Sequence, residues 1–427
     1  MLIHVVKPGD TLYKIGREHG VSPFQLAAAN GIAYHSTLAV GQTIVVQFPT
    51  LSHTVTPGQS LLEIARQYGV SVISLYQNNP QLAGRPQLSP GQQLVITFDQ
   101  EKLGSFEING YGQPSIAENL LRKTLPYLTY VTPFTYGINA NGSLVTLNDG
   151  HMIAVAKEYD TAALMHLSTL TEQGNFDSAR ASAVLNHPDA QDRLVDRVVQ
   201  NITQKGYVGL DVDFEFVPKQ DAQAYAAFIL QLRSRLNPLG YPVITALAPK
   251  TSAMQRGAIY EGHLYREIGT ASNAVFVMTY EWGYTYGPPQ AVSPLPSVRA
   301  VLNYTVSEIL PEKVFMGISN YGYDWTLPFQ KGDKARSVSN DEAVALAVQY
   351  SAEIQYDNTA QAPYFNYYDR AGREHIVWFE DARSIQAKLA LIPEYGLRGA
   401  GYWNIMRPYQ QGWTVLNSLY HIKRVGE

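Results

Sequence analysis

Runs of apolar residues alternate with amphipathic stretches through most of the chain after about residue 103. Eight of these runs are short and rich in Val, Ile, Ala and aromatic residues, as strands are: residues 105–111, 127–135, 163–170, 207–215, 243–248, 274–280, 314–321 and 399–405. Helical patterns lie between them, for example at residues 115–122, 191–204, 220–236, 297–309 and 385–392. Eight such units predict an α/β fold of the (β/α)8 type, a TIM barrel with insertions.

The fourth strand-like run, Val-Gly-Leu-Asp-Val-Asp-Phe-Glu over residues 208–215, alternates acidic and apolar residues. Because side chains alternate between the two faces of a strand, Asp211, Asp213 and Glu215 share one face. Carboxylates this close cannot all ionise cheaply, so the pKa of at least one is raised. A carboxylic acid that stays protonated near neutral pH can transfer a proton, which predicts catalysis.

A different interpretation of this run is an edge strand whose polar face lies in water. The flanking sequence favours a central strand, because helical patterns precede it up to Gly206 and follow it up to Asn237-Pro238. A parallel strand between two helices is covered on both sides. Its polar residues then point into a barrel or lie at its carboxyl end, where active sites of such folds are found.

The segment between the seventh strand and the last helix, residues 322–383, is longer than an ordinary loop. It contains one helical pattern, 340–354, and two strand-like runs, 364–368 and 375–379, joined by a turn at Asp369 to Gly372. We expect a reduced α+β insertion here, with a correspondingly shallow cleft.

The first hundred residues contain an internal repeat. His-Val-Val-Lys-Pro-Gly-Asp-Thr-Leu at residues 4–12 recurs as His-Thr-Val-Thr-Pro-Gly-Gln-Ser-Leu at residues 53–61. Gly-Val-Ser, Asn and Gly-Gln follow at matching positions in both copies. Each copy reads as strand, Pro-Gly turn, helix, helix and strand, with Thr11 or Ser60 capping the first helix. We therefore expect two small βααβ modules, over residues 1–49 and 50–99, ahead of a barrel at 100–427.

These repeats resemble the LysM module, a family that binds glycans containing N-acetylglucosamine, such as peptidoglycan and chitin. The resemblance implies a sugar groove between the first turn and the loop before the last strand. The residues that it indicates are Gly9, Asp10, Thr11 and Asn30 in the first copy and Gly58, Gln59, Ser60 and Asn79 in the second. Most of these residue types also build turns and caps, which is the alternative role for each.

Composition narrows the possible partners. The 427 residues carry a net charge of −4 from 32 basic and 36 acidic residues, well mixed along the chain, which does not favour nucleic acid or an anionic membrane. There is no cysteine and no long apolar stretch or secretory leader pattern. The 10 histidines are scattered, so neither a metal site nor another cofactor is expected. The 29 tyrosines and 5 tryptophans suit stacking on sugars.

From residue 103 to the end, the chain resembles the family 18 glycoside hydrolases. The family signature Asp-x-x-Asp-x-Asp-x-Glu is matched at Asp211, Asp213 and Glu215, with Val208 at its first position and Phe214 where Trp is commoner. Three further motifs match: Met-Thr-Tyr-Glu at 278–281, Gly-Ile-Ser-Asn-Tyr-Gly at 317–322 and Gly-Tyr-Trp-Asn at 401–404.

The resemblance implies a retaining mechanism in which the N-acetyl group of the substrate is the nucleophile. Glu215 would protonate the leaving oxygen and later activate water, while Asp213 would hold the acetamide N–H, with Asp211 beneath it. Tyr280 would donate its hydroxyl to the acetamide carbonyl. Trp403 would stack under the sugar.

Other residues are weaker candidates for sugar binding. Glu281 replaces the usual Asp of its motif, and it either contacts the sugar and the acid pair or forms a structural salt bridge. Tyr136, Asn320 and Tyr321 lie at predicted strand ends. The alternative role for Tyr280 is that of a tyrosine packed in the barrel, and the alternative role for Trp403 is that of an ordinary core tryptophan.

Two LysM modules ahead of such a barrel resemble the cortical fragment-lytic enzymes of bacterial endospores, N-acetylglucosaminidases that degrade cortex peptidoglycan during germination. The resemblance implies a location at the coat and cortex of the spore without a signal peptide. A chitinase or general wall autolysin is one alternative, and a non-catalytic glycan-binding coat protein is another. The sequence leaves endo or exo action, muramic lactam dependence and oligomeric state open.

Overall fold

The computed structural model describes residues 1–171 and 174–426. Its centre is a closed barrel of eight parallel strands: β5 (Ser105–Gly112), β6 (Tyr130–Pro133), β9 (Ala162–Ser168), β10 (Gly209–Asp213), β11 (Val243–Leu247), β12 (Ala274–Val277), β13 (Val314–Ser319) and β19 (Gly399–Trp403). Closure comes from the parallel pairing of β19 with β5. A two-residue strand, β20 (His421–Ile422), adds to the start of β5. The predicted (β/α)8 barrel is confirmed.

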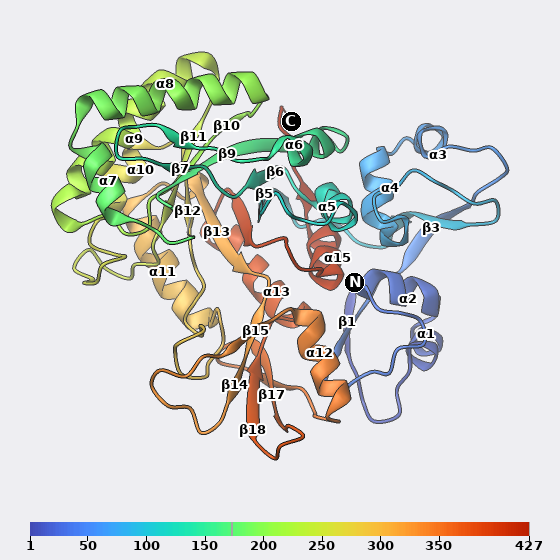
Figure 1. The fold of residues 1–427 in the computed structure, drawn as a ribbon. Coiled ribbons are helices and arrows are strands. Elements are labelled where there is room, and N and C mark those ends of the chain that lie inside the picture. The colour runs from blue at the N-terminus through green and yellow to red at the C-terminus, as the bar shows by residue number, and fades with distance from the viewer. Residues whose placement is uncertain (172–173, 427) are drawn as a thin grey trace.

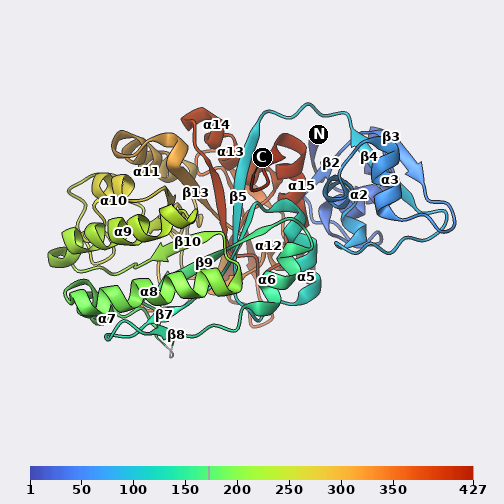
Figure 2. The same cartoon turned by 90° about the horizontal axis from the view of Figure 1, so that it is seen from above.

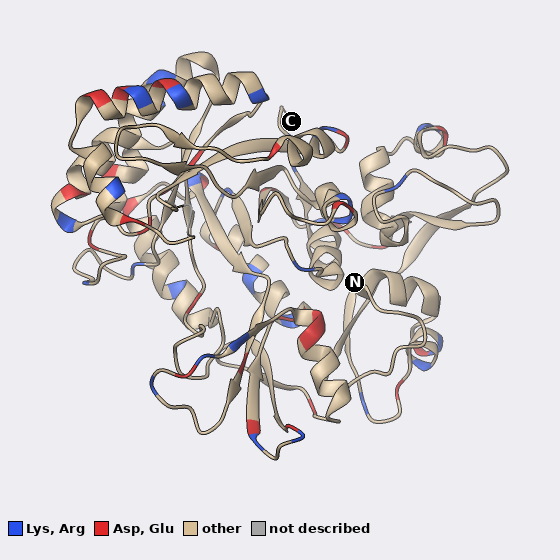
Figure 3. Ribbon diagram, in the orientation of Figure 1, with Lys and Arg blue, Asp and Glu red and all other residues tan. Residues whose placement is uncertain are grey.

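Helices surround the barrel (Figures 1 and 2). They are α5 (Glu118–Thr124), α6 (Gly150–Lys157), α7 (Ser178–Leu185), α8 (Pro188–Lys205), α9 (Ala222–Leu236), α10 (Tyr265–Ala271), α11 (Leu295–Glu308), α13 (Ala382–Leu389), α14 (Leu391–Tyr395) and α15 (Gln410–Leu419). Along α8, buried Leu194, Val198 and Ile202 form the inner face, and both signs of charge occur along its length (Figure 3). No described helix combines the length and the apolar character needed to cross a bilayer.

The insertion after β13 is a five-stranded antiparallel sheet with one helix. It comprises β14 (Gly322–Thr326), β15 (Arg336–Val338), α12 (Asn340–Gln349), β16 (Gln355–Asp357), β17 (Ala362–Tyr368) and β18 (Glu374–Trp378). The sequence predicted only α12, β17 and β18. Strands β15 and β16 are three residues long each, too short for a periodicity to show, and β14 follows the seventh barrel strand almost directly.

Both repeats fold as βααβ modules, as predicted. The first contains β1 (Leu2–Val5), α1 (Leu12–His19), α2 (Pro23–Asn30) and β2 (Thr43–Val46). The second contains β3 (Pro49–Thr54), α3 (Leu61–Tyr68), α4 (Val72–Asn78) and β4 (Gln93–Phe98). In each module the two strands pair antiparallel. Thr11 and Ser60 cap α1 and α3 through their side-chain oxygens.

The modules pack against the side of the barrel rather than hanging on a free linker (Figures 1 and 2). In the first module, Nε2 of Gln411 on α15 donates to Oδ1 of Asn30 at 2.9 Å and to the carbonyl of Thr43 at 2.7 Å. In the second, Nε2 of Gln77 donates to the carbonyl of Pro126 at 2.7 Å. Both modules also contact α15, since Nδ2 of Asn417 donates to Oδ1 of Asn78 in the second module at 3.2 Å.

Candidate active site

A pocket of about 240 Å³ opens at the carboxyl ends of the barrel strands, the end at which barrel enzymes carry their active sites. Its lining combines acids and aromatic rings: Tyr111, His166, Asp213, Glu215, Ala246, Pro249, Ile259, Tyr260, Phe276, Met278, Tyr280, Glu281 and Trp403. Five of the sequence-predicted site residues thus meet in one cavity.

The acidic run of β10 leads from the barrel interior toward this pocket. Asp211 is fully buried, Asp213 nearly so, and Glu215, just beyond the strand end, is half-buried. The hydroxyl of Tyr111 donates to Oδ2 of Asp211 at 2.6 Å. Oδ1 of Asp211 and Oδ1 of Asp213 are buried and have no hydrogen-bond partner among the described residues. Unpartnered buried carboxylate oxygens are costly, which favours a bound proton on this pair.

The surroundings of the three acids raise all three pKa values. Burial raises the pKa of Asp211 to about 7. The pKa of Asp213 lies well above its usual range because of burial and then the charges of Glu215 and Asp211. Burial, followed by the negative charge of Glu281, raises the pKa of Glu215 to about 7. Glu215 can therefore carry a proton near neutral pH and release it to a leaving group.

Tyr280 and Trp403 complete the pocket. Tyr280 is buried, and that burial, followed by the charge of Asp213, raises its pKa well above the usual range, so its hydroxyl remains a donor. The ring of Trp403 is partly open to the pocket and packs edge-on against Phe134, with ring centroids 4.9 Å apart. A partly open indole that lines a pocket beside carboxylates can stack on a sugar face.

Glu281 forms no salt bridge among the described residues, so the structural-pair alternative finds no support. The hydroxyls of Tyr321 and Tyr323 donate to its carboxylate instead. Its backbone φ of +69° lies in the left-handed region, which non-glycine residues rarely adopt; residues with such backbone strain cluster at active sites. Tyr321 thus forms a hydrogen bond with Glu281 and does not line the pocket itself.

Sequence reasoning missed Tyr111 and His166. His166 is the one strongly polar residue inside the apolar run of β9, and in a covered parallel strand such a residue must face the lumen. Its Nε2 lies 3.8 Å from Oδ2 of Asp213, and its Nδ1 lies 2.6 Å from Oγ1 of Thr135. Burial lowers the pKa of His166 to about 3, so the imidazole is neutral.

Two weaker candidates lie elsewhere. Tyr136 is buried outside the pocket, where its hydroxyl donates to Asp149 and Nζ of Lys205 lies 2.5 Å from it. Asn320 is buried, and its Nδ2 donates to the carbonyls of Asn404 and Arg407 at 3.0 and 3.2 Å. Neither side chain lines the pocket, and both fasten neighbouring structure, so their assignment to sugar binding stays a prediction.

The glycan residues expected in the modules fall into two groups. Gly9, Thr11, Gly58 and Ser60 are exposed, and Asp10 and Gln59 partly so. Asn30 and Asn79 are buried: each donates Nδ2 to two backbone carbonyls and accepts one backbone N–H through Oδ1. These two asparagines fasten the second helix to the last strand, and their assignment to sugar contact stays a prediction.

Although the histidines are scattered along the sequence, the fold brings two of them together with a carboxylate. His4, Glu18 and His19 place one potential ligand atom each within 4.8 Å of one another. The sequence hid this group because His4 comes from β1 and the other two residues from the end of α1, which only the module fold brings together.

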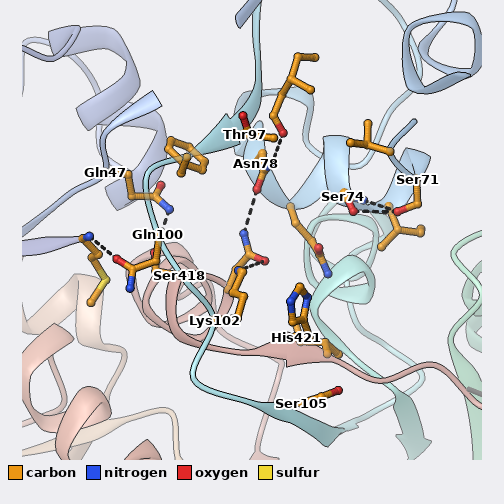
Figure 4. A pocket seen from close by; sticks show the side chains of 18 of the residues that line it. Gln47, Ser71, Ser74, Asn78, Thr97, Gln100, Lys102, Ser105, Ser418 and His421 are labelled. Carbon is orange, nitrogen blue, oxygen red and sulfur yellow. Dashed lines mark hydrogen bonds between the residues drawn. The ribbon is translucent and has the colours of Figure 1, made fainter. Parts of the chain in front are cut away.

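A larger cavity, about 760 Å³, lies between the second module and the amino-terminal end of the barrel (Figure 4). Amides and hydroxyls such as those of Gln47, Ser74 and Asn78 line it, together with Lys102. Burial lowers the pKa of Lys102 to about 8. Since Ser105 begins β5 here, this cavity is at the opposite end of the barrel from the acids.

Comparison with known proteins agrees with this geometry. Residues 111–407 match the model of glycosyl hydrolases family 18, and residues 4–47 and 53–97 each match the LysM domain. A cortical fragment-lytic enzyme of Bacillus subtilis (strain 168) is 40% identical, with 99% of each chain covered.

Solved structures give the same result. The crystal structure of the Bacillus cereus spore cortex-lytic enzyme SleL superposes with a TM-score of 0.84 at 37% identity, covering 100% of this chain and 99% of that one. A chitinase from Chromobacterium violaceum gives a TM-score of 0.68 at 25% identity, covering 73% of this chain and 98% of that one. The chain therefore belongs to glycosyl hydrolases family 18, as a glycoside hydrolase that carries two LysM domains.

Proposed function

We propose that this enzyme cleaves N-acetylglucosaminyl bonds of spore cortex peptidoglycan during germination, by substrate-assisted catalysis with retention of configuration. The observation that carries the proposal is the acidic run Asp211, Asp213 and Glu215, which ends in a pocket that Trp403 also lines. The full-length similarity to a cortical fragment-lytic enzyme supports the choice of glycan.

In the first step, protonated Glu215 gives its proton to the glycosidic oxygen, while the acetamide oxygen of the sugar attacks the anomeric carbon. Asp213 accepts a hydrogen bond from the acetamide N–H and stabilises the positive charge of the cyclic intermediate. Asp211 shares a proton with Asp213, and Tyr111 holds it in place. In the second step, ionised Glu215 takes a proton from water, which opens the intermediate on the same face.

Tyr280 and Trp403 set the geometry. The Tyr280 hydroxyl, which stays protonated, donates to the acetamide carbonyl and directs its oxygen toward the anomeric carbon. Trp403 supports the apolar face of the same sugar. The exposed turns of the two modules at Gly9 to Thr11 and Gly58 to Ser60 hold the enzyme on the glycan, in a protein located in the spore.

The test compares wild type and Glu215→Gln on purified cortex fragments and on chitin oligomers, with products identified by mass spectrometry. We expect wild type to release fragments ending in N-acetylglucosamine from cortex, and the variant to be slower in kcat by about 10²- to 10⁴-fold. Faster cleavage of chitin oligomers would indicate a chitinase. Equal, negligible release by both proteins would indicate a glycan-binding protein without activity.

A second substrate separates the mechanism from the target. Cortex fragments stripped of their acetyl groups lack the internal nucleophile, so wild type should not cleave them at a measurable rate. Cleavage of stripped and intact fragments at equal rates would contradict substrate assistance and leave the choice of glycan unaffected.

A further inference from the structure

The first module contains a compact group of three potential metal ligands that the catalytic site does not use. Nδ1 of His4, on β1, lies 3.2 Å from Nε2 of His19, at the end of α1. A carboxylate oxygen of Glu18 completes a set in which all three atoms lie within 4.8 Å of one another. It is the one such group of His, Cys, Asp or Glu in residues 1–171 and 174–426.

The fold also orients His4. Its Nε2 lies 3.0 Å from Oδ2 of Asp10, and the same oxygen accepts the backbone N–H of Lys7 at 2.8 Å. Because a carboxylate only accepts hydrogen bonds, the proton of neutral His4 is on Nε2, and the lone pair of Nδ1 faces His19. Histidines that bind metals are commonly held in this way by a carboxylate behind the ring.

The second module shows that the fold does not require these ligands. At the position of His4 it has His53, whose Nδ1 lies 3.0 Å from the hydroxyl of Tyr68 and whose Nε2 lies 2.9 Å from Oε1 of Gln59. Gln67 and Tyr68 stand where the first module has Glu18 and His19. The hydrogen-bonded frame is the same in both copies, yet only the first provides a second imidazole and two carboxylates.

We propose that the first module binds one divalent transition-metal ion, zinc being the best match, through His4, His19 and Glu18. Two nitrogens bound to tetrahedral zinc lie about 3.3 Å apart, close to the 3.2 Å between the two imidazoles. Two imidazoles and one carboxylate suit zinc, copper or nickel better than calcium or magnesium. With water as fourth ligand, the ion ties β1 to the end of α1 and stabilises the module.

Titration calorimetry of the full-length chain without a polyhistidine tag, with zinc chloride as the titrant, tests the site. The matched variant is Glu18→Gln with His19→Tyr, which installs the residues of the second module on the same frame. We expect one zinc ion per wild-type chain, a rise in Tm with zinc, and loss of both effects in the variant. Asp10→Gln, which copies Gln59, should weaken binding by about 10- to 100-fold.

Cobalt(II) gives a second readout, because a tetrahedral site with imidazole ligands produces visible absorption that wild type should show and the double variant should lack. Circular dichroism without metal confirms that the variant is folded. Absence of binding to wild type, or an unchanged stoichiometry in the folded double variant, would overturn the proposal. Neither result depends on glycosidase activity.

Discussion

The three acids lie on β10 and just beyond its end, and they differ in their access to water, from fully buried Asp211 to half-buried Glu215. Desolvation is the largest cause of the raised pKa at every one of them, and neighbouring charges add to it at Asp213 and Glu215. The inner two are thus suited to share a proton, while the outermost can exchange its proton with a substrate and with water.

Glu281→Gln should move the pH profile of kcat/KM. The acid form of Glu215 is required, so the rate falls as pH rises through its pKa of about 7. Removing the negative charge of Glu281 removes a repulsion that raises this pKa, so the alkaline limb should shift to lower pH. Glutamine can still accept the hydroxyls of Tyr321 and Tyr323.

The control for this profile is Glu101→Gln, an exposed residue before the barrel, which should leave the limb in place. An alkaline limb that does not move in Glu281→Gln would show that Glu281 does not act on Glu215 through its charge.

Asp211→Asn should reduce the loss of stability with rising pH. The pKa of Asp211 is about 7 in the folded chain, against about 3.9 when unfolded. Between these values the folded state binds more protons, so its free energy of unfolding falls as pH rises. Asparagine cannot titrate and still accepts the Tyr111 hydroxyl. Urea unfolding at several pH values should show a smaller decline than in wild type, whereas exposed Asp189→Asn should match wild type.

At the scale of single residues, the sequence predicted the acids, Tyr280 and Trp403 because motif spacing and strand alternation place them directly. Asn30, Asn79, Tyr136 and Asn320 lie outside the pocket and hold neighbouring elements together. Each of these is a polar residue at the end of an element, where contact with a ligand and a hydrogen bond to a neighbouring loop use the same side chains. Only tertiary contacts decide between the two roles.

At the scale of elements, the packing of the residue that follows β10 against α9 positions the acids. Phe214 is fully buried between the strand and α9, stacked on Tyr225 with ring centroids 5.5 Å apart. It lies between Asp213 and Glu215 in sequence, so its packing fixes the backbone that carries both. Phe216, two residues on, is 37% exposed.

Phe214→Ala should therefore destabilise the chain by about 3–5 kcal/mol and lower kcat, because the cavity it leaves frees the end of β10. Phe216→Ala removes the same ring from a half-open position and should cost far less. Denaturant unfolding and kcat on cortex fragments measure the two effects. Similar losses of stability in both variants would show that the Phe214 contact with α9 is not decisive.

Helices were predictable where the helical periodicity extended over several turns, as in α8 and α9. The eight barrel strands were predictable as short apolar runs between helical patterns. The insertion shows the limit. Its sheet is completed by strands of three residues, β15 and β16, which pair with the neighbouring strands β14 and β17. Such strands exist because of their neighbours and leave no pattern of their own.

At the scale of the whole molecule, the first module packs closely against the insertion of the barrel domain. The backbone N–H of Ile354, beside the insertion sheet, donates to the carbonyl of Val40 in the first module at 2.9 Å. Next to Val40, Gly41 has a φ of +82°, and a Cβ added there would lie 1.9 Å from the carbonyl oxygen of Ile354. The equivalent glycine of the second module, Gly91, has a φ of +84° and open space around it.

Gly41→Ala and Gly91→Ala form a matched pair. Both introduce a Cβ at positive φ, which costs about 1–2 kcal/mol, but only Gly41→Ala also collides with Ile354. We expect a larger loss of stability for Gly41→Ala, together with faster hydrogen exchange at the amide of Ile354. Equal behaviour of the two variants would mean that the first module is not fitted closely to the insertion.

This fit has a consequence for the duplicated modules. Asn30 and Asn79 occupy the same place in the two copies, yet of the two only Asn30 accepts the amide of Gln411, while the second copy contacts the barrel through Gln77 and Asn78. The two modules are consequently not interchangeable. In a chain with their order reversed, each module would face the part of the barrel surface that fits the other module. The contacts with the barrel surface, rather than the segment that joins the modules, therefore determine the order in which the two modules follow each other.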